Sequence, residues 1–553
     1  MTTRRHAVHV PQVPSRGKRA RTVSVGVTEG IHTGLPAHLL PAGFTPDARN
    51  FYPYTDGWIE PRSGLSQHGT YNFNGPVLGA AEVFDTLGNS CGVAPSATSL
   101  AFLHPSSGAW SNLSYVPSTI THVRGNLSGT STDYFRTVSV YDPGTDQFLA
   151  VVSNDTSTVK FFSVLSTTTT FSDFSWLDSL ASHAKARDLT VVNDRLVFFN
   201  LEDSNGTRYP TRVLWSARGD PKNFALASEA GWEDLMSMRG SGQAIVRFRD
   251  FSLLFTEYEI WRATPTLDSY AFRFDRVIDN LGCPFPKTIA VTPNGVIFVE
   301  HDLEVYITDG SVVVPLGPVG GEGPSRIQRL LRDESVNRER MWAIYNHTDN
   351  RYEVYFTASD SVEGYPTRAL FYDFTSKSWW PQRFSFGISA AVDLYDYTTF
   401  VSYDEVEDTY DSTSLEYDAY DVRQKNRRVN VFTSLGSSLR YRSEATNDAG
   451  SLTIDARWKS PGIRSSDHHQ MHLSEIWVDY ENDSSSSASI FLGDARSDTF
   501  GDGKNLNLTS SGAPLHVAAW KTSPAPAFEV RIADGGKPRL TLFVATLKDA
   551  SKF

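Results

Sequence analysis

Short runs of alternating apolar and polar residues fill most of the chain between about residues 50 and 400. Gly, Pro, Asn and Asp separate the runs, as in "TVSVYDPGTDQFLAVVS" and "LTVVNDRLVFFN". An alternation with a period of two places every second side chain on one face of a strand. "TPNGVIF" adds Asn-Gly between apolar residues, a strong signal for a tight hairpin. The pattern therefore predicts antiparallel β-structure.

Several of these units end in a similar way. "HPSSGAWSNLS" and "YDFTSKSWWPQ" share a strand, a polar turn and then Trp. A degenerate unit of roughly 40–50 residues is typical of propeller blades, so we predict an all-β fold with a β-propeller of about six to eight irregular blades. Helical patterns are few: 325–336 carries Ile327, Leu330 and Leu331 at helical spacing, and 175–188 is a weaker candidate.

The composition changes along the chain and suggests four parts. Residues 1–30 form a basic N-terminal arm, and 31–400 the propeller. Residues 401–430 form a charged linker or loop, in which eight carboxylates precede a basic cluster. Residues 431–553 return to alternating strands and predict a smaller C-terminal antiparallel β-domain, resembling a sandwich. The default interpretation of 401–430 is a solvated loop; the sharper one is a segment that contacts a ligand or lines a lumen.

The bulk composition fits large buried cores. The chain has 553 residues, of which 40% are hydrophobic and 12% aromatic. A net charge of −12 argues against a protein that coats nucleic acid, though it fits one that must let nucleic acid pass. Two cysteines do not make a disulfide framework, and no apolar run is long enough to span a bilayer as a helix.

Familiar catalytic and cofactor motifs are missing from the sequence. The dinucleotide, phosphate-loop, zinc-protease and nucleophile-elbow patterns are absent. His468, His469 and His472 lie close together, but turn-into-strand flanks would not make them converge on a metal. The acidic segment could attract calcium, yet it lacks EF-hand spacing. We therefore expect no cofactor, no metal site and no enzymatic activity.

Four stretches taken in order resemble a known family. They are the segments 34–66, 207–224, 253–310 and 369–381, which include "FTPDARNFYPYTDGWIEPRSGLS", "TRVLWSARGDPKNF", "LLFTEYEIWRATPTLDSYAFRF" and "ALFYDFTSKSWWP". In this order and spacing they resemble the tail nozzle, tail-tube B-type or tail-stabilisation proteins of short-tailed bacteriophages. The likeness covers about residues 30–400 and extends loosely into the C-terminal part.

The resemblance implies a structural virion protein located in the phage tail and assembled in the host cytoplasm. It implies a ring homo-oligomer, usually a hexamer, below the portal and adaptor proteins of the head-tail connector. Such a ring extends the DNA channel, retains the packaged genome and permits DNA ejection. Its other partners would be tail fibres or spikes and the passing double-stranded DNA, which it would not bind sequence-specifically.

The residues that carry the resemblance are expected to be architectural. Glycines suit turns, tryptophans suit blade cores with the indole N–H bonded to backbone, and arginines suit pairing with carbonyls or carboxylates between blades. The set is Asn50, Gly57, Trp58, Arg62, Gly64, Arg212, Trp215, Ser216, Gly219, Pro221, Gly282, Asp309, Gly310, Asp373 and Trp379. The opening segment 44–66 is expected to lead into the first blade.

A second set is a candidate for contacts with the channel or with a neighbouring subunit, because acids and bases lie side by side there. These residues are Asp404, Glu405, Glu407, Asp408, Asp411, Arg423, Lys425, Arg427 and Arg428. Two alternatives from other functional classes remain. One is a propeller that binds a carbohydrate or receptor; the other is a glycosidase-type propeller, which would need paired carboxylates.

Overall fold

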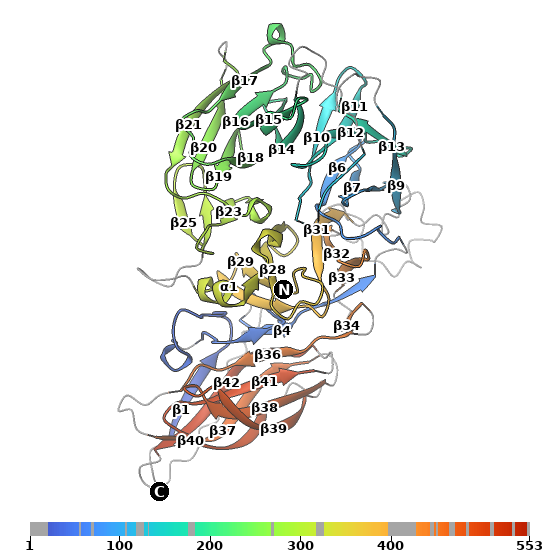
Figure 1. Ribbon diagram of the computed structural model, residues 1–553. Helices are drawn as coiled ribbons and strands as arrows, with labels where there is room; N and C mark the ends of the chain where they lie inside the picture. The colour runs from blue at the N-terminus through green and yellow to red at the C-terminus, as the bar shows by residue number, and fades with distance from the viewer. Residues whose placement is uncertain are drawn as a thin grey trace, which may run out of the picture.

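The computed structural model describes most of the chain. The described residues are 20–41, 43–54, 57–67, 71–104, 108–117, 126–130, 132–174, 183–266, 270–316, 326–395, 427–442, 447–449, 452–463, 470–482, 486–508, 514–533 and 537–549. They form two β-bodies: a ring of small sheets and, beside the rim of the ring, a sandwich (Figure 1).

The ring is a β-propeller, and its blades are antiparallel sheets of about four strands. The first three blades contain β6 (Ala81–Phe84), β7 (Ser90–Pro95), β8 (Leu100–Leu103), β9 (Trp110–Tyr115), β10 (Arg136–Asp142), β11 (Gln147–Ser153), β12 (Lys160–Ser163), β13 (Thr170–Asp173), β14 (His183–Val192), β15 (Arg195–Asp203), β16 (Arg208–Trp215) and β17 (Gly231–Asp234). The next three contain β18 (Gly242–Phe248), β19 (Phe251–Thr256), β20 (Ile260–Pro265), β21 (Phe272–Ile278), β22 (Ala290–Thr292), β23 (Gly295–Val299), β24 (Val305–Thr308), β25 (Val313–Pro315), β26 (Ser335–Val336), β27 (Trp342–Asn346), β28 (Arg351–Ala358), β29 (Arg368–Asp373) and β30 (Ser378–Arg383).

A last blade closes the ring with strands from both ends of the propeller sequence. It consists of β31 (Ile388–Tyr395), β32 (Arg427–Thr433), β33 (Ser438–Arg442) and the N-terminal β5 (Gly64–Gln67). β5 pairs antiparallel with β33, with Gly64 opposite Arg442 and Gln67 opposite Leu439. Backbone hydrogen bonds thus hold together the first and last parts of the ring. Of the segment 44–66, only the end from Gly64 onward enters the propeller, where it completes the last blade rather than starting the first.

The innermost strands contact one another in cyclic order. The order is β6, β10, β14, β18, β22, β27, β31 and back to β6, so the described residues form seven blades around a closed ring. The first two blades also join at their outer edges, where β13 pairs in parallel with β9. The prediction of an all-β propeller with a smaller β-domain is confirmed, and the number of blades falls within the predicted range.

The second body is a sandwich of two sheets. One sheet contains β1 (Ala20–Gly26), β3 (Phe51–Pro53), β4 (Ile59–Pro61), β37 (Met471–Glu481), β40 (Leu515–Ser523) and β42 (Arg539–Asp549). The other contains β2 (Ala48–Arg49), β36 (Ala456–Lys459), β38 (Ser486–Asp494), β39 (Thr499–Leu508) and β41 (Pro526–Ile532). Between them lies an apolar core in which Trp458, Phe528 and Phe543 are fully buried. A short ribbon, β34 (Asn447–Asp448) with β35 (Leu452–Thr453), follows the propeller.

The structure divides the chain differently from the predicted domain boundaries. Most of residues 20–61 belongs to the sandwich, since β1 pairs with β42 along its whole length. Residues 427–442 belong to the propeller. Residues 396–426 lie outside the described residues, but the strands on either side of them form one hairpin within the last blade. The charged segment is therefore an insertion in a blade and does not link two domains. A local pattern indicates a strand but not its distant partner.

Helices are few in the described residues. α1 (Gln328–Glu334) confirms the helix expected within 325–336. The weaker helix prediction at 175–188 is wrong for its second half, because β14 begins at His183 and pairs with β15. Single 3-10 turns are η1 (Ala37–Leu39), η2 (Leu226–Ser228), η3 (Pro286–Thr288) and η4 (Arg338–Arg340). Among the described residues no helix is long and apolar enough to cross a membrane.

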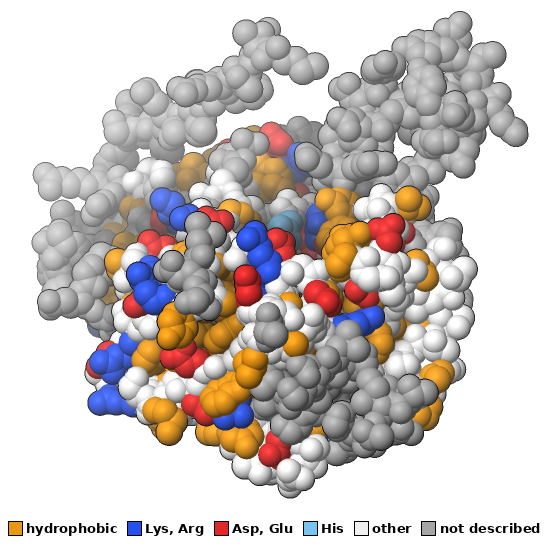
Figure 2. Space-filling model, turned by 90° about the horizontal axis from the view of Figure 1, so that it is seen from above, with side chains coloured by type: hydrophobic (Ala, Val, Ile, Leu, Met, Phe, Trp, Pro, Cys, Tyr) orange, Lys and Arg blue, Asp and Glu red, His pale blue; other side chains and the backbone are white. Residues whose placement is uncertain are grey.

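Viewed from above, described side chains of both charges are interspersed with apolar ones (Figure 2). This face carries no field of a single charge that would by itself indicate a partner of opposite charge.

Candidate functional site

Arg62 is the centre of a buried polar cluster where the propeller meets the sandwich. Its side chain is 1% exposed, and its guanidinium forms a bidentate ion pair with the carboxylate of Asp448, with Nη1 donating to Oδ1 at 2.8 Å. The same guanidinium donates to the carbonyl oxygens of Ser63 and Arg383, and lies 4.6 Å from the centre of the Phe384 ring. Asp448 also accepts the backbone N–H of Leu65, at the start of the closing strand. This cluster thus connects three segments of the chain.

Asn50 extends this cluster with both its backbone and its side chain. Its φ of 57° is left-handed, a conformation that Asn tolerates better than most residues. Its Oδ1 accepts from the backbone N–H of Arg383 at 2.8 Å and from Nε of Arg62 at 3.3 Å. Its Nδ2 donates to the carbonyl of Asp455 at 2.8 Å. Asn50 therefore joins the outer strand of the sixth blade to the sandwich.

The outer strand β30 supplies the rest of this junction. Trp380 belongs to the apolar core of the sandwich, although it lies in a blade. Gln382 donates to the carbonyl of Phe51 at 2.9 Å, and the N–H of Ile31 donates to the carbonyl of Trp379. Gly30 has a φ of 77°, and a Cβ there would lie 2.7 Å from that same carbonyl oxygen, so the close approach requires glycine.

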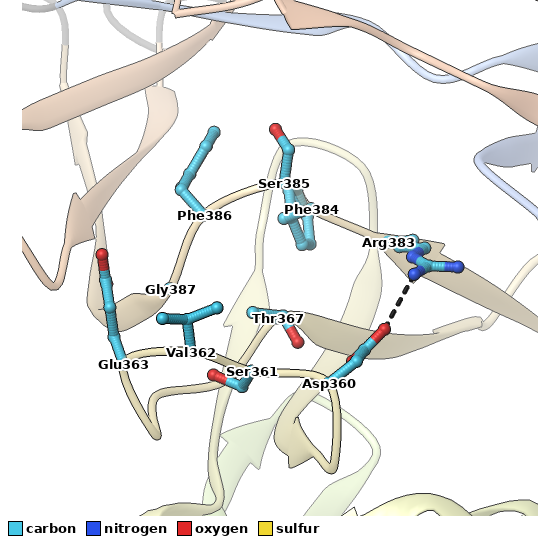
Figure 3. Close-up of a pocket in the computed structure, with 10 residues that line it drawn as sticks. All are labelled: Asp360, Ser361, Val362, Glu363, Thr367, Arg383, Phe384, Ser385, Phe386 and Gly387. Carbon is cyan, nitrogen blue, oxygen red and sulfur yellow. Dashed lines mark hydrogen bonds and ion pairs between the residues drawn. The ribbon is translucent and has the colours of Figure 1, made fainter.

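A pocket opens beside this junction. It has a volume of about 280 Å³ and lies between the loop that joins β28 to β29 and the connection from β30 to β31 (Figure 3). Asp360 accepts from both Arg383 and Arg368 at 2.8 Å. On the opposite side, Glu363 accepts from the hydroxyl of Ser434. Phe384 is shared with the junction, because its ring lies under Arg62.

The carboxylates of the pocket are held by neighbouring side chains. Both carboxylates already have hydrogen-bond partners, and the hydroxyl of Thr367 is buried without a partner among the described residues. Among the described residues, no three His, Cys, Asp or Glu side chains gather closely enough to hold a metal ion.

The tryptophans of the resemblance lie in blade cores. Trp379 is fully buried, and its indole N–H donates to the carbonyl of Leu316 at 3.2 Å. Trp215 is nearly buried and donates to the carbonyl of Glu229 at 3.2 Å. The neighbouring Ser216 accepts the N–H of Leu196 with its hydroxyl. These bonds satisfy the indole and hydroxyl groups inside the blades, which fits an architectural role.

Arg212 lies at the edge of the third blade. It pairs with Asp234 through two bonds of 2.7 Å and is held between the rings of Tyr209 and Trp232, at 3.7 and 4.1 Å. The carboxylate raises the pKa of Arg212, chiefly through the hydrogen bonds. The pair joins adjacent strands of one blade, whereas the sequence suggested contacts between blades.

The remaining residues of the resemblance shape turns and close contacts. Asp309 accepts the N–H groups of Ser311 and Val312, and these bonds, with the Ser311 hydroxyl first, lower its pKa to about 2. Asp373 likewise accepts two turn N–H groups at 2.7 Å. Trp58 stacks on Tyr54 with ring centres 4.0 Å apart. Three of the remaining glycines, Gly57, Gly219 and Gly310, have positive φ. Gly64 is the first residue of β5, and Pro221 is buried in a turn. Gly282 packs against the carbonyl of Thr256.

The structure describes only two of the charged residues proposed for channel or subunit contacts. Arg427 bridges two inner strands, donating to Glu82 of the first blade at 2.7 Å and to Asp393 of the last at 3.4 Å. Burial raises the pKa of Glu82. Arg428 lies opposite Leu394 in the same hairpin. Arg427 therefore helps to close the ring within one chain. Asp404, Glu405, Glu407, Asp408, Asp411, Arg423 and Lys425 lie outside the described residues.

Most of the buried carboxylates were not singled out from the sequence, and Asp448 and Glu353 are two examples. Asp448 sits in "TNDAG", which resembles an ordinary loop. Glu353 is 1% exposed in β28, accepts from Asn346 at 3.0 Å and from the hydroxyl of Tyr355 at 2.8 Å, and has its pKa raised by burial to about 7. An acid within the apolar alternation of "RYEVYFTA" is the signal that could have identified Glu353.

Of the three histidines near residue 470, the structure describes only His472. His468 and His469 lie outside the described residues. His472 lies in β37, where its Nδ1 is 2.9 Å from the hydroxyl of Thr522 and its ring is 5.5 Å from that of Trp520.

Comparison with known proteins gives structural neighbours only. No protein-family model and no curated protein sequence matches the chain. Among solved structures, it is similar to an exo-beta-1,3-galactanase from Phanerochaete chrysosporium with beta-1,3-galactotriose, at 8% identity and a TM-score of 0.25 over 95% of this chain and 99% of that one. The same galactanase with galactose is 8% identical, with a TM-score of 0.24 over 74% of this chain and 95% of that one. A mutant of AofleA from Arthrobotrys oligospora is 11% identical, with a TM-score of 0.30 over 66% of this chain and 96% of that one.

These neighbours correct one prediction. The expectation that the chain is not an enzyme is contradicted, because two of the solved structures named above are of a galactanase, and we withdraw it. TM-scores of 0.24 to 0.30 do not carry an activity over to this chain.

Proposed function

We propose that this chain is a structural component of a bacteriophage tail, a nozzle or hub subunit. In this proposal, several copies, six by the resemblance, form a ring below the portal and adaptor. The ring extends the DNA channel, retains the genome until ejection and offers attachment for fibres or spikes. The ordered set of four sequence stretches supports this proposal, and it spans about residues 30–400.

One structural observation adds the strongest support. Two residues of the resemblance, Asn50 and Arg62, form the solvent-free cluster that fastens the sandwich to the propeller rim. A ring subunit that withstands the pressure of packaged DNA needs its two domains in one fixed arrangement. Buried, fully bonded polar groups favour a single arrangement, because other arrangements leave charges unpaired.

The charge of the chain is compatible with a DNA channel. With a net charge of −12, the subunit repels phosphate over roughly 10 Å at moderate salt. A ring of such subunits would let DNA slide without binding it tightly. The acidic insertion between β31 and β32 follows directly on β31, the innermost strand of the last blade.

Electron microscopy of particles with and without this protein tests the proposal. We expect a ring below the portal in particles that contain the protein, and leaking or empty heads in particles that lack it. The full chain, mixed with portal and adaptor proteins, should enter a complex whose mass gives the number of copies. A chain that stays monomeric and never joins such a complex would contradict the proposal. Release of sugar from β-1,3-galactan by the purified chain would instead support a glycosidase.

A further inference from the structure

The outer face of one sandwich sheet carries an open row of aromatic side chains. In β37 and β40 the inward residues are apolar and buried, such as Ile476 and Val517. The outward residues include Trp477 and His516, whose rings lie 4.6 Å apart, and His472 and Trp520, whose rings lie 5.5 Å apart. Figure 1 shows β37 and β40 in the lower part of the sandwich, away from the propeller.

Trp520 is the most exposed tryptophan of the described residues, with 76% of its surface accessible. It projects from β40, which forms the edge of its sheet. His516 lies four residues before Trp520 on the same strand, roughly 13 Å away at about 3.3 Å per residue. The two indole–imidazole pairs therefore stand in line along the strand, separated by about the length of two sugar rings.

Hydrogen-bonding groups lie between and beside these rings. Glu475 is placed opposite Ala518, between the two pairs, and its carboxylate is 4.0 Å from Nε2 of His516. Asp479 follows on the same face, and burial, with repulsion from Glu481, raises its pKa. The surface thus alternates flat apolar faces with acceptors, which matches a molecule that has both C–H faces and hydroxyl groups.

We propose that this row, Trp520, His472, Glu475, Trp477 and His516, is a binding site for a neutral oligosaccharide. Pyranose rings would stack on the two indoles, and their hydroxyl groups would donate to Glu475 and Asp479. This site lies in the sandwich, so it goes beyond the proposed tail function and does not depend on it.

The charges of the row favour an uncharged ligand. The carboxylates of Glu475 and Asp479 lie on this face beside the rings. Glu481 is paired there with Arg539 at 3.9 Å, and Lys548 lies opposite His472. At the rings themselves, Glu475 and Asp479 would repel the phosphate, sulfate or carboxylate groups of an acidic ligand. A second protein fits less well, because a stable interface needs about 800 Å² from each partner, with few charges at its centre. Here a carboxylate interrupts the apolar row at its middle.

Titration of the full chain with defined oligosaccharides tests this site. The probes are cellotetraose, maltotetraose and tetra-N-acetylchitotetraose as neutral chains and a heparin tetrasaccharide as the acidic one, with binding followed by calorimetry and tryptophan fluorescence. We expect at least one neutral probe to bind. Trp520→Ala should weaken that binding at least tenfold, and Trp520→Phe should restore part of it. The matched control is Tyr270→Ala, since Tyr270 is 77% exposed on a propeller blade, and it should bind normally.

Several results would overturn the proposal. They are no binding of any neutral probe, tighter binding of the acidic probe, and equal loss in the Trp520 and Tyr270 variants. Self-association of the chain that Trp520→Ala abolishes would instead assign the row to a second copy. If no saccharide binds, the tail proposal is unaffected, because electron microscopy of particles tests that proposal separately.

Discussion

The interior of the sandwich and the junction with the propeller are equally shielded from water but built from opposite chemistry. In the sandwich, Trp458 stacks on Phe543 with ring centres 5.2 Å apart, among apolar neighbours. At the junction, Arg62 and Asp448 form a bidentate ion pair with side chains 1% and 3% exposed. One region excludes water with rings, and the other does so with charges that satisfy each other.

Apolar contacts and a buried ion pair contribute to the fold in different ways. Apolar burial stabilises by roughly 25 cal/mol per Å² and depends little on direction. A buried ion pair adds little net stability, because the cost of desolvating both charges offsets their attraction. Removing only one of the two partners is costly, because the other charge then stays buried without a partner. We infer that the sandwich core supplies stability, while the Arg62 cluster selects one arrangement of the two domains.

The largest effect is expected when the junction loses its cation. Arg62→Met should lower the free energy of unfolding by about 3–5 kcal/mol, because it leaves the Asp448 carboxylate buried and unpaired. Denaturant titration measures the loss. The control is Arg273→Ala, which removes an exposed pair with Asp275 and should cost at most about 1 kcal/mol.

A double variant sharpens the same comparison. Arg62→Met together with Asp448→Met removes both charges, so most of the lost stability should return. Small-angle scattering should then show a looser arrangement of the two domains, because the directional contacts are gone. A double variant as unstable as the single one, or one with an unchanged domain arrangement, would contradict the role assigned to this ion pair.

The next effect separates two fully buried tryptophans. Trp379 donates its indole N–H to the carbonyl of Leu316, whereas the indole nitrogen of Trp458 has no hydrogen-bond partner among the described residues. Both Trp→Phe changes remove ring volume, but Trp379→Phe also leaves a carbonyl unpaired. We expect Trp379→Phe to be more destabilising by about 1 kcal/mol. Equal losses in denaturant titration would show that the bond to Leu316 contributes nothing.

A further effect depends on pH and comes from the buried acid in β28. Burial raises the pKa of Glu353 to about 7 from an ordinary value of 4.5. Between these values the folded protein holds a proton that the unfolded chain releases, so this group's stabilising contribution falls as the pH rises towards 7. Glu353→Gln should remove this slope, which is at most about 1.4 kcal/mol per pH unit.

Unfolding curves at pH 5, 6, 7 and 8 measure this pH effect. Glu481→Gln is the control, since that side chain is 75% exposed and should leave the slope unchanged. A slope that persists in Glu353→Gln would assign the pH dependence to another group.

The sequence predicted the kind of elements well and their partners poorly. Alternation in runs such as "RLVFFNLED" sufficed to predict strands and a propeller, because the period of two is a local property. The pairing of β5 with β33 and of β1 with β42 joins distant segments, and no local pattern contains that information. The predicted domain boundaries therefore failed at both ends of the propeller.

The same limit applied to the candidate site. Arg62 could be singled out, but its partner Asp448 lies 386 positions away in an unremarkable loop. The exposed row around Trp520 also gave no signal, since Trp in a strand is usually a core residue. Which face of a strand is buried depends on the second sheet, and that sheet is assembled from segments spread over the chain.

The smallest effect is expected at an exposed turn, where solvent weakens the same kind of charge-assisted bond that is strong at Arg62. Asp309 accepts from Ser311 and Val312, and these bonds lower its pKa to about 2. Its contribution is present above the ordinary value of 3.8 and is lost as the pH falls towards 2. Because Asp309 is exposed, Asp309→Asn should change the free energy of unfolding at pH 7 by no more than about 0.5 kcal/mol. A loss as large as that of Arg62→Met would mean that burial does not set the strength of these contacts, and the contrast between junction and surface would fail.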